Sequence, residues 1–452
     1  MCPYAPLMPI FARRRLQAML NDLAPRAGDH KLGDLRARLE SKRVDQALPA
    51  EVELAVLWAL TALGEFEIEP AWFGNSRPDA YTEHLFEGVP CVVEITAVSD
   101  GRLSQDDDMR RVAARLCAVA NQIRKGAGKH LYFQFDEEHG YTTTGFVRRR
   151  RVDKDFDPTD ATLEQLRTWL SSRGDGGEPL HLTQGRTHVV VSWRRHPQHT
   201  HSNFFSTMPA EAYSLEDNPL HEALKAKARQ LSSPDFQGLR CIIVADVGSR
   251  LLRLTDYGMR SPGTVTGKQI ITHFLKETDG AVDVVVVLTA QRGDDSLSSP
   301  ERPVRWRAAT LVHPAMQVKE SGVTRMLASL PPPRFEGYQA RSLHQQAAYR
   351  PDGRGWYVGT SIISKGSRMT FKVSARALLD LLAGHITQEQ FQQSTGLKDK
   401  PGSRNILSHR LEQGDILSKV QIESGGLDED DDWLVLEFTS DPSAAPLRVP
   451  KR

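Results

Sequence analysis

The sequence predicts an α/β protein in which a mixed β-sheet is flanked by helices and is followed by a separate α+β region toward the C-terminus. Three observations predict this class. Residues 48–136 show the pattern of a helix, three strands and a further helix. Two helix–strand units follow at 218–246 and 265–288. The prolines at 331–333 then mark a linker, beyond which short strands and short helices resume.

Composition and charge fit a globular protein of two or three domains. The chain has 452 residues and a net charge of +1, so it lacks the global basic signature of many DNA-binding proteins. Charge can still gather on one face, which keeps nucleic acid open as a partner. The cysteines have no paired spacing and are expected to be free thiols in a reducing compartment. They are Cys2, Cys91, Cys117 and Cys241.

The N-terminal residues do not have the pattern of a secretory signal. An apolar stretch from Tyr4 to Phe11 precedes the arginines at 13–15, whereas a signal places its charges before the apolar core. The longest apolar run, near 281–290, is too short to cross a bilayer. We therefore expect a cytoplasmic protein with no membrane partner.

The first core element is a predicted helix over residues 50–63, which is mostly apolar and rich in helix formers. Gly64 is expected to end it. Glu51 and Glu53 would then lie in its first turn, where the helix dipole favours acids.

Two acids on the following strands form the candidate site. Asp79 follows Pro78 at the start of one strand, a turn spans 87–90, and Glu94 is the single acid of the β-rich run 91–96. A hairpin would bring the two carboxylates to within about 6 Å of each other, close enough to share one cation. Because buried like charges repel, such a pair usually holds a cation or shares a proton. Hard oxygen ligands suit Mg²⁺ or Mn²⁺.

The acids follow a recognisable order: a helix with Glu53, a strand, a strand with Pro-Asp79, a strand with Glu94-Ile-Thr, and a helix. This order resembles the PD-(D/E)xK nuclease superfamily, which has a restriction-endonuclease-like core. The resemblance covers residues 48–136 and extends to 215–250. The motif itself is short, and its place in this succession of elements gives it weight.

The resemblance implies a role for each matching residue. Asp79 and Glu94 would be the metal-binding acids, and the backbone carbonyl of Ile95 would be a further ligand. Glu53 would be the accessory acid of the first helix. The implied cofactor is Mg²⁺, or Mn²⁺ in its place, and the implied reaction is hydrolysis of a phosphodiester bond.

The active strand departs from the family pattern at Thr96, where the family usually has lysine. A hydroxyl cannot supply positive charge to the attacking water or to the developing phosphorane. A predicted helix over 218–231, with Asn218 as its N-cap and Pro219 at its first position, carries lysines ahead of a buried strand. Lys227 is our first choice for the missing cation. The other candidates are Lys225, then Lys125 and Lys129.

Two elements compete for the fourth strand of the core. A predicted helix over 105–125 leads into the strand 131–135, which could close the sheet. Alternatively, the helix 218–231 and the strand 239–246 close it after an insertion. The sequence leaves both arrangements open.

Two further clusters have competing interpretations. A basic run indicates either a nucleic-acid-binding patch that contacts phosphates or a solvated loop. Its members are Arg148, Arg149, Arg150 and Arg151. A second cluster, His196, His199 and His201, would need a fourth ligand, and usually cysteine partners, to hold zinc.

Three domains are expected. An N-terminal helical segment covers 1–47, and a nuclease-like domain covers 48–330 with an insertion at about 137–215. A C-terminal accessory domain covers 336–452. Because no catalytic constellation lies within it, this last domain is expected to serve regulation or partner binding.

The function expected from these features is that of a metal-dependent nuclease acting on nucleic acid, with DNA favoured over RNA. Its expected setting is a restriction-like or anti-phage defence effector, acting as a homo-oligomer or beside a protein partner, such as a guide-binding short Argonaute. The alternative is a catalytically inactive nuclease-fold scaffold that binds nucleic acid or a protein, which Thr96 favours. A third class, a small-molecule hydrolase built on the histidine cluster, has the least support.

Overall fold

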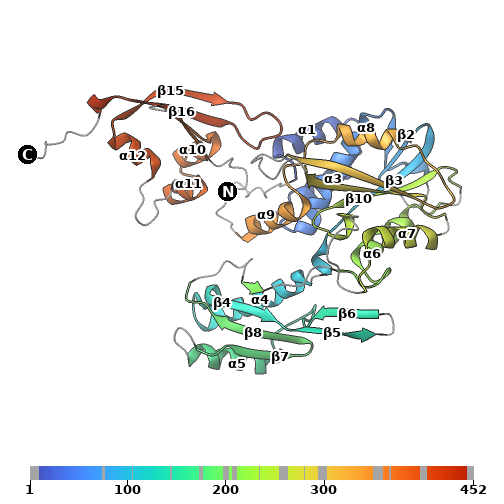
Figure 1. Ribbon diagram of the computed structural model, residues 1–452, viewed down its shortest axis with the longest axis horizontal. Coiled ribbons are helices and arrows are strands. Elements are labelled where there is room, and N and C mark those ends of the chain that lie inside the picture. Colours follow the sequence, from blue (N-terminus) through green and yellow to red (C-terminus); the bar gives the residue numbers. More distant parts are fainter. Residues whose placement is uncertain are drawn as a thin grey trace, which may run out of the picture.

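A six-stranded mixed sheet with helices on both faces forms the core of the protein, which confirms the predicted fold class (Figure 1). The computed structural model describes residues 10–73, 77–103, 105–142, 145–172, 177–196, 203–205, 211–233, 235–253, 263–278, 280–293, 303–349, 360–365, 368–395, 397 and 405–444. The strands, in their order across the sheet, are β1 (Phe66–Ile68), β2 (Ala80–Phe86), β3 (Val89–Val98), β10 (Leu239–Asp246), β11 (Val284–Arg292) and β12 (Val304–Val312). The pairs β3–β10 and β10–β11 are parallel, and the other pairs are antiparallel.

The two faces of this sheet bury separate hydrophobic clusters. Along β10, Cys241 and Ile243 belong to one cluster, whereas Ile242 and Val244 belong to the other. This alternation explains why the strand reads as a continuous apolar run, since both of its faces are covered. The first face is covered by α1 (Arg13–Leu23), α2 (Asp29–Leu39), α3 (Val44–Thr61) and α8 (Ser321–Ser329). The second face is covered by α6 (Pro219–Gln230) and α7 (Gly267–Glu277).

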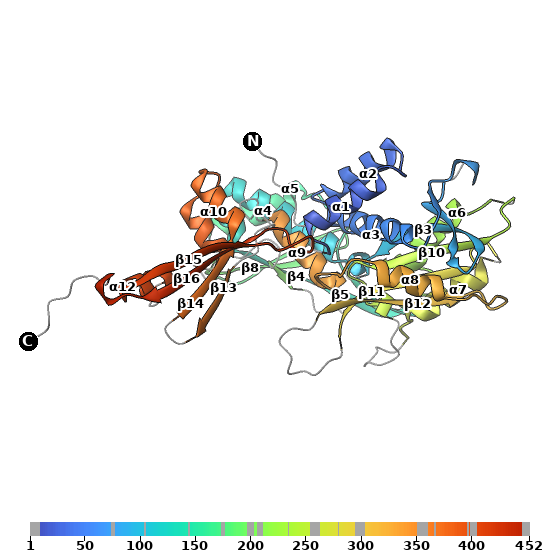
Figure 2. The same ribbon diagram turned by 90° about the horizontal axis from the view of Figure 1, so that it is seen from above.

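Helix α3 starts earlier than the sequence suggested. It begins at Val44 and carries Pro49 within it, so Glu51 and Glu53 lie well beyond its first turn. The helix dipole therefore does not account for these acids. Glu51 is fully buried, and one of its oxygens accepts the backbone N–H groups of Ile10 and Phe11, each at 3.0 Å. The acid ties the segment before α1 to the core, and Figure 2 shows α1 and α2 beside α3.

The strand 131–135 does not close the core sheet. It is β4 (Leu131–Phe135), which belongs to a separate sheet of order β7-β8-β4-β9, whereas β10 is the strand beside β3. The other strands of this second sheet are β7 (Leu180–Gln184), β8 (Thr187–Trp193) and β9 (Phe204–Phe205). Helices α4 (Asp106–Ile123) and α5 (Asp160–Ser171) pack on it, and β5 (Glu137–Thr142) and β6 (Gly145–Arg150) form a hairpin. The insertion therefore includes α4 and begins before residue 137.

The C-terminal strands form a third sheet of order β13-β14-β16-β15, and none of its described strands joins the core sheet. Its strands are β13 (Thr360–Lys365), β14 (Arg368–Ser374), β15 (Asp415–Glu423) and β16 (Trp433–Ser440). The expected short helices are present as α10 (Ala375–Leu382), α11 (Gln388–Ser394) and α12 (Ile406–Glu412). In contrast, α9 (Gly337–Tyr349) packs on α3, and its Arg341 donates to Asp45 at 2.6 Å and to Asp107 at 3.1 Å. Helix α9 thus lies with the core, although its sequence falls within 336–452.

Three of the four cysteines are free, as expected, and these three are buried, whereas Cys2 lies outside the described residues. Within the part of the chain that the structure describes, no helix combines the length and the apolar character needed to span a bilayer.

We predict that the free energy of unfolding depends on pH through Glu51. Burial raises the pKa of Glu51 from 4.5 to about 8. Between these values the folded protein keeps a proton that the unfolded chain releases, so stability is full below pH 4.5 and is lost as the pH rises toward 8. Glu51→Gln keeps an oxygen acceptor and removes this titration. In chemical denaturation, the free energy of unfolding of the variant should rise relative to that of wild type by at least about 1 kcal/mol between pH 5 and pH 8.5. If the difference in unfolding free energy between variant and wild type stayed constant over this pH range, Glu51 would not be the source of the pH dependence.

We also predict that the boundary of the folded core lies after α9. A chain ending at Tyr349 keeps the contacts of Arg341 and should unfold in one cooperative thermal transition. A chain ending at residue 335 loses the helix and exposes the α3 surface beneath it, so its Tm should be lower by several degrees. Equal Tm values for the two truncations would show that α9 contributes nothing to the core.

Candidate active site

The hairpin of β2 and β3 places Asp79 beside Glu94. Ala80 pairs with Val93 across the two strands, so Asp79, one residue earlier, stands opposite Glu94. Directly opposite residues on paired strands have their side chains on the same face. Both acids are buried, and Glu94 is only 1% exposed. The strand pairing therefore brings two carboxylates together in a place with little access to water.

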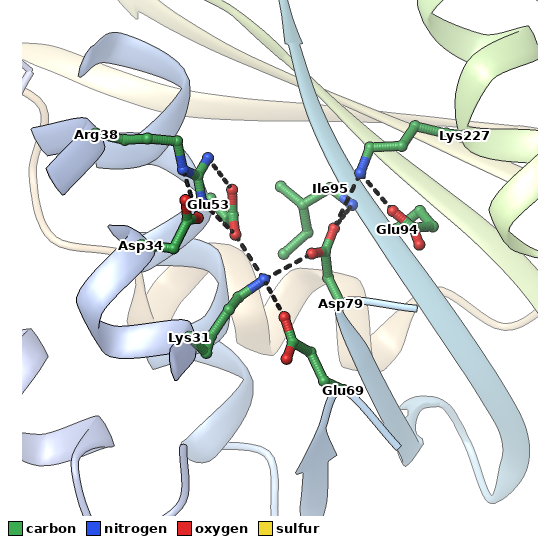
Figure 3. A network of polar contacts seen from close by, with 9 residues as sticks. All are labelled: Lys31, Asp34, Arg38, Glu53, Glu69, Asp79, Glu94, Ile95 and Lys227. Atoms are coloured by element: carbon green, nitrogen blue, oxygen red, sulfur yellow. Dashed lines mark hydrogen bonds and ion pairs between the residues drawn. The ribbon is translucent and has the colours of Figure 1, made fainter. Parts of the chain in front are cut away.

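Helix α6 brings the first-choice lysine to this pair. The Asn218 side chain caps the helix and Pro219 is its first residue, as the sequence predicted. Lys227 Nζ lies 3.3 Å from Asp79 Oδ2 and 2.5 Å from Glu94 Oε2 (Figure 3). Because one ammonium touches both acids, their carboxylates lie closer together than the expected limit of about 6 Å. The predicted positions of the acids and of Lys227 are confirmed.

The other lysine candidates lie elsewhere. Lys225 is exposed on α6, and Lys125 and Lys129 are exposed in the segment that follows α4. Thr96 is half-buried on β3, two residues beyond Glu94, and has no charge to contribute. The geometry therefore selects Lys227 from the set that the sequence offered.

A second lysine, which sequence reasoning missed, completes the site. Lys31 Nζ on α2 lies 2.9 Å from Asp79 Oδ1, 2.9 Å from Glu53 Oε1 and 3.1 Å from Glu69 Oε1 (Figure 3). Lys31 is only 6% exposed, although lysine is rarely buried this deeply. The sequence contained one sign of this burial: Lys31 lies four residues before Leu35, on the buried face of α2.

Glu53 lies on the Lys31 side of the site. It accepts two hydrogen bonds from the Arg38 guanidinium, at 2.8 and 3.1 Å, in addition to its contact with Lys31. Asp79 joins the two sides, because one of its oxygens contacts Lys31 and the other contacts Lys227. The predicted accessory acid, Glu53, is therefore connected to Asp79 through Lys31.

The charges of this network shift one another. Burial alone would raise the pKa of Asp79, but Lys227 and Lys31 outweigh it and hold that pKa at about 2. Burial and the neighbouring Asp79 raise the pKa of Glu94 to about 8, against the opposing effect of Lys227. Burial lowers the pKa of each lysine, but the surrounding acids outweigh this and raise it. Asp79 is thus the more readily ionised of the two acids, Glu94 is the one that more readily takes up a proton, and both lysines are cations.

Ile95 contacts the acids through its N–H group, which donates to Asp79 Oδ2 at 2.8 Å. This bond orients Asp79 toward Lys227 and Glu94. The role of the Ile95 carbonyl as a metal ligand stays a prediction.

The predicted nucleic-acid-binding arginines lie on and just after β6, and each has an acidic partner. Arg148 and Arg150 both pair with Glu137, at 2.6 and 2.5 Å, and Arg150 is buried. Arg149 lies 3.3 Å from Asp217, and Arg151 lies 3.8 Å from Glu138. The run therefore offers less free positive charge than its sequence suggests, and contact with phosphate stays a prediction.

Within the described residues, one group of three acids and histidines is spaced closely enough to hold a metal ion. Glu216, just before α6, and His273 and Glu277, both on α7, place one ligand atom each within 4.8 Å of one another. Of the predicted histidine cluster, His199 and His201 lie outside the described residues.

The site that emerges has hard oxygen donors and compact cations around buried Asp79 and Glu94. Such a set can bind a divalent cation and can stabilise negative charge that develops on a substrate. No protein-family model, curated protein or solved structure matches the chain.

Proposed function

We propose that the protein is a Mg²⁺- or Mn²⁺-dependent nuclease that hydrolyses phosphodiester bonds in nucleic acid, with DNA favoured over RNA. One observation carries this proposal: Lys227 Nζ reaches both Asp79 and Glu94 from a separate helix. It thereby supplies the positive charge that Thr96 cannot. Neither the acids nor the lysine alone would be informative, but a lysine shared by two buried acids is the arrangement that the family resemblance requires.

The donor set fits the proposed metal ion. Asp79 and Glu94 offer hard carboxylate oxygens, and their contact with the same ammonium, Lys227 Nζ, shows that the two acids face one point. When bound, the divalent ion would act as a Lewis acid and lower the pKa of a coordinated water. Asp79 is held ionised and oriented by its neighbours, ready to serve as a ligand.

Lys227 would act as a cation rather than as a general base. Burial lowers its pKa, but the attraction of Asp79 and Glu94 outweighs burial and raises it, so the amine keeps its proton. A protonated lysine stabilises the negative charge that develops at the scissile phosphate. Lys31, on the other side of Asp79, fixes the orientation of that acid.

The biological setting that we propose is a restriction-like or anti-phage effector. The large inserted unit and the C-terminal sheet lie outside the core that holds the site, and such accessory parts suit control of when cleavage occurs. A subunit that works beside a guide-binding partner, such as a short Argonaute, is one form of this proposal. The assignment rests on analogy of architecture.

We predict that Lys227→Ala and Asp79→Ala lower the rate of metal-dependent cleavage by about two orders of magnitude or more, because each removes charge at the reacting centre. Plasmid DNA and RNA cleavage would be followed with Mg²⁺, Mn²⁺ and EDTA. Lys227→Arg should restore little of the cleavage rate, since a planar guanidinium differs from a compact ammonium. Lys225→Ala is the matched control, because Lys225 is exposed on the same helix, and it should cleave like wild type. Wild-type rates in folded Lys227→Ala would refute the role of this lysine.

A scaffold without catalysis is the second candidate function. The observation that favours it is the pairing of the acids, since Lys31 and Lys227 neutralise Asp79 and Glu94 without any metal ion. The same experiment separates the two functions. Binding of nucleic acid that EDTA does not weaken, together with no cleavage under any metal condition, would favour the scaffold.

A further inference from the structure

The Lys31 ammonium is held by three carboxylates at once. It is surrounded by oxygens of Glu53, Glu69 and Asp79, all at 2.9 to 3.1 Å. These acids come from α3, from the segment after β1, and from the start of β2, so the fold gathers them from three separate elements. Three carboxylates that converge on one buried point require a cation there, and the chain supplies it from α2.

Asp79 has a cation on each of its oxygens. Oδ1 contacts Lys31, and Oδ2 faces Lys227 and the Ile95 N–H group. A carboxylate that bridges two cations is the pattern of enzymes that place two metal ions about 3.5–4 Å apart to cleave phosphate esters. In this chain, an ammonium lies on each side, and Lys31 on the Glu53 side is the more buried of the two: its side chain is 8% exposed, against 21% for Lys227.

We propose that Lys31 is a resident cation that takes the place of a second divalent ion, so that the chain binds one such ion, at Asp79 and Glu94, and excludes another from the Glu53–Glu69 side. The inference rests on the proposed metal site at Asp79 and Glu94. It makes Lys31 a positioning residue, because it occupies Asp79 Oδ1 and leaves Oδ2 turned toward Glu94 and Lys227.

The surroundings keep Lys31 in place. The lysine is 6% exposed and shares the buried stripe of α2 with Leu35 and Leu39, which belong to the core. Arg38, one turn from Leu35 on the same helix, holds Glu53 with two hydrogen bonds. Withdrawal of Lys31 would take one cation from three carboxylates and leave Glu53 only Arg38 and Asp79 only Lys227 as cationic partners, so displacement of the lysine is costly.

Glu69 allows the Lys31 side of the site to be changed separately from the Asp79–Glu94 pair. Its carboxylate contacts Lys31, and none of its described polar contacts reaches Glu94 or Lys227. Its backbone has a φ of 48°, which is uncommon for a residue other than glycine, and its N–H donates to the Asp79 carbonyl at 3.3 Å. Glu69 can therefore be changed without altering the ligands of the proposed metal site.

The test is the number of Mn²⁺ ions bound per folded chain, measured by titration calorimetry and by electron paramagnetic resonance of free Mn²⁺. Wild type should bind one ion. Lys31→Ala, which leaves the three carboxylates around an open space, should bind two, and Lys31→Ala/Glu69→Gln should lose most of the affinity gained at the new position. Arg36→Ala is the matched control for loss of a positive charge from α2, because Arg36 is exposed, and it should bind one ion.

Two results would overturn the inference: two ions bound to wild type, or no additional ion in folded Lys31→Ala. Should Lys31→Ala fail to fold without metal, the number of Mn²⁺ ions bound to wild type decides alone. Recovery of the thermal transition of Lys31→Ala on addition of Mn²⁺ would then support the inference. Cleavage assays report separately on the proposed function. Wild type that cleaves with two bound ions would refute the role of Lys31 only. An inactive wild type, with Lys31→Ala gaining one ion, would refute the nuclease and leave the role of Lys31 intact.

Discussion

The bridged carboxylate of Asp79 is the interaction on which the rest of the site depends. It joins α2, the β2–β3 hairpin and α6, because Lys31 approaches one of its oxygens and Lys227 the other. Each of these charges would be costly to bury alone, and each is tolerated because the others compensate it. The same compensation sets the protonation states, with Asp79 held ionised and the pKa of Glu94 raised. Fold and chemistry are therefore linked at a single side chain.

The core sheet keeps this geometry although a large unit is inserted between its strands. Strand β10 pairs with β3 in parallel, and Glu94 lies opposite Ile242 in that register. Helix α6 precedes β10 and contacts β3, so its Lys227 reaches the strand that carries Glu94. The inserted residues have their own hydrophobic cluster, which allows them to fold beside the core without altering it. Long insertions at such a connection cost little in loop-closure entropy.

Charges at both ends of the chain are also compensated within the molecule. The acidic run at 428–432 contacts the arginines at the start of α1: Arg15 donates to Asp428 at 2.8 Å, and Arg14 donates to Asp432 at 2.8 Å. Asp430 accepts the backbone N–H of Arg13 at 2.6 Å, near the positive end of the helix dipole. The acidic run therefore serves as a partner for the N-terminal helix that precedes α2 and Lys31.

The sequence by itself determined the features that follow from local rules. A β-rich run and a turn before it predicted the hairpin that pairs Asp79 with Glu94, and the Asn218–Pro219 start predicted the helix that carries Lys227. Only the tertiary structure decided which strand lies beside β3, that α9 belongs with the core, and that Lys31 enters the site from 48 residues before Asp79. Local propensities depend on neighbours along the chain, whereas the partner of a buried charge depends on which distant elements pack together. A lysine in an apolar stripe signals that such a partner exists but does not identify it.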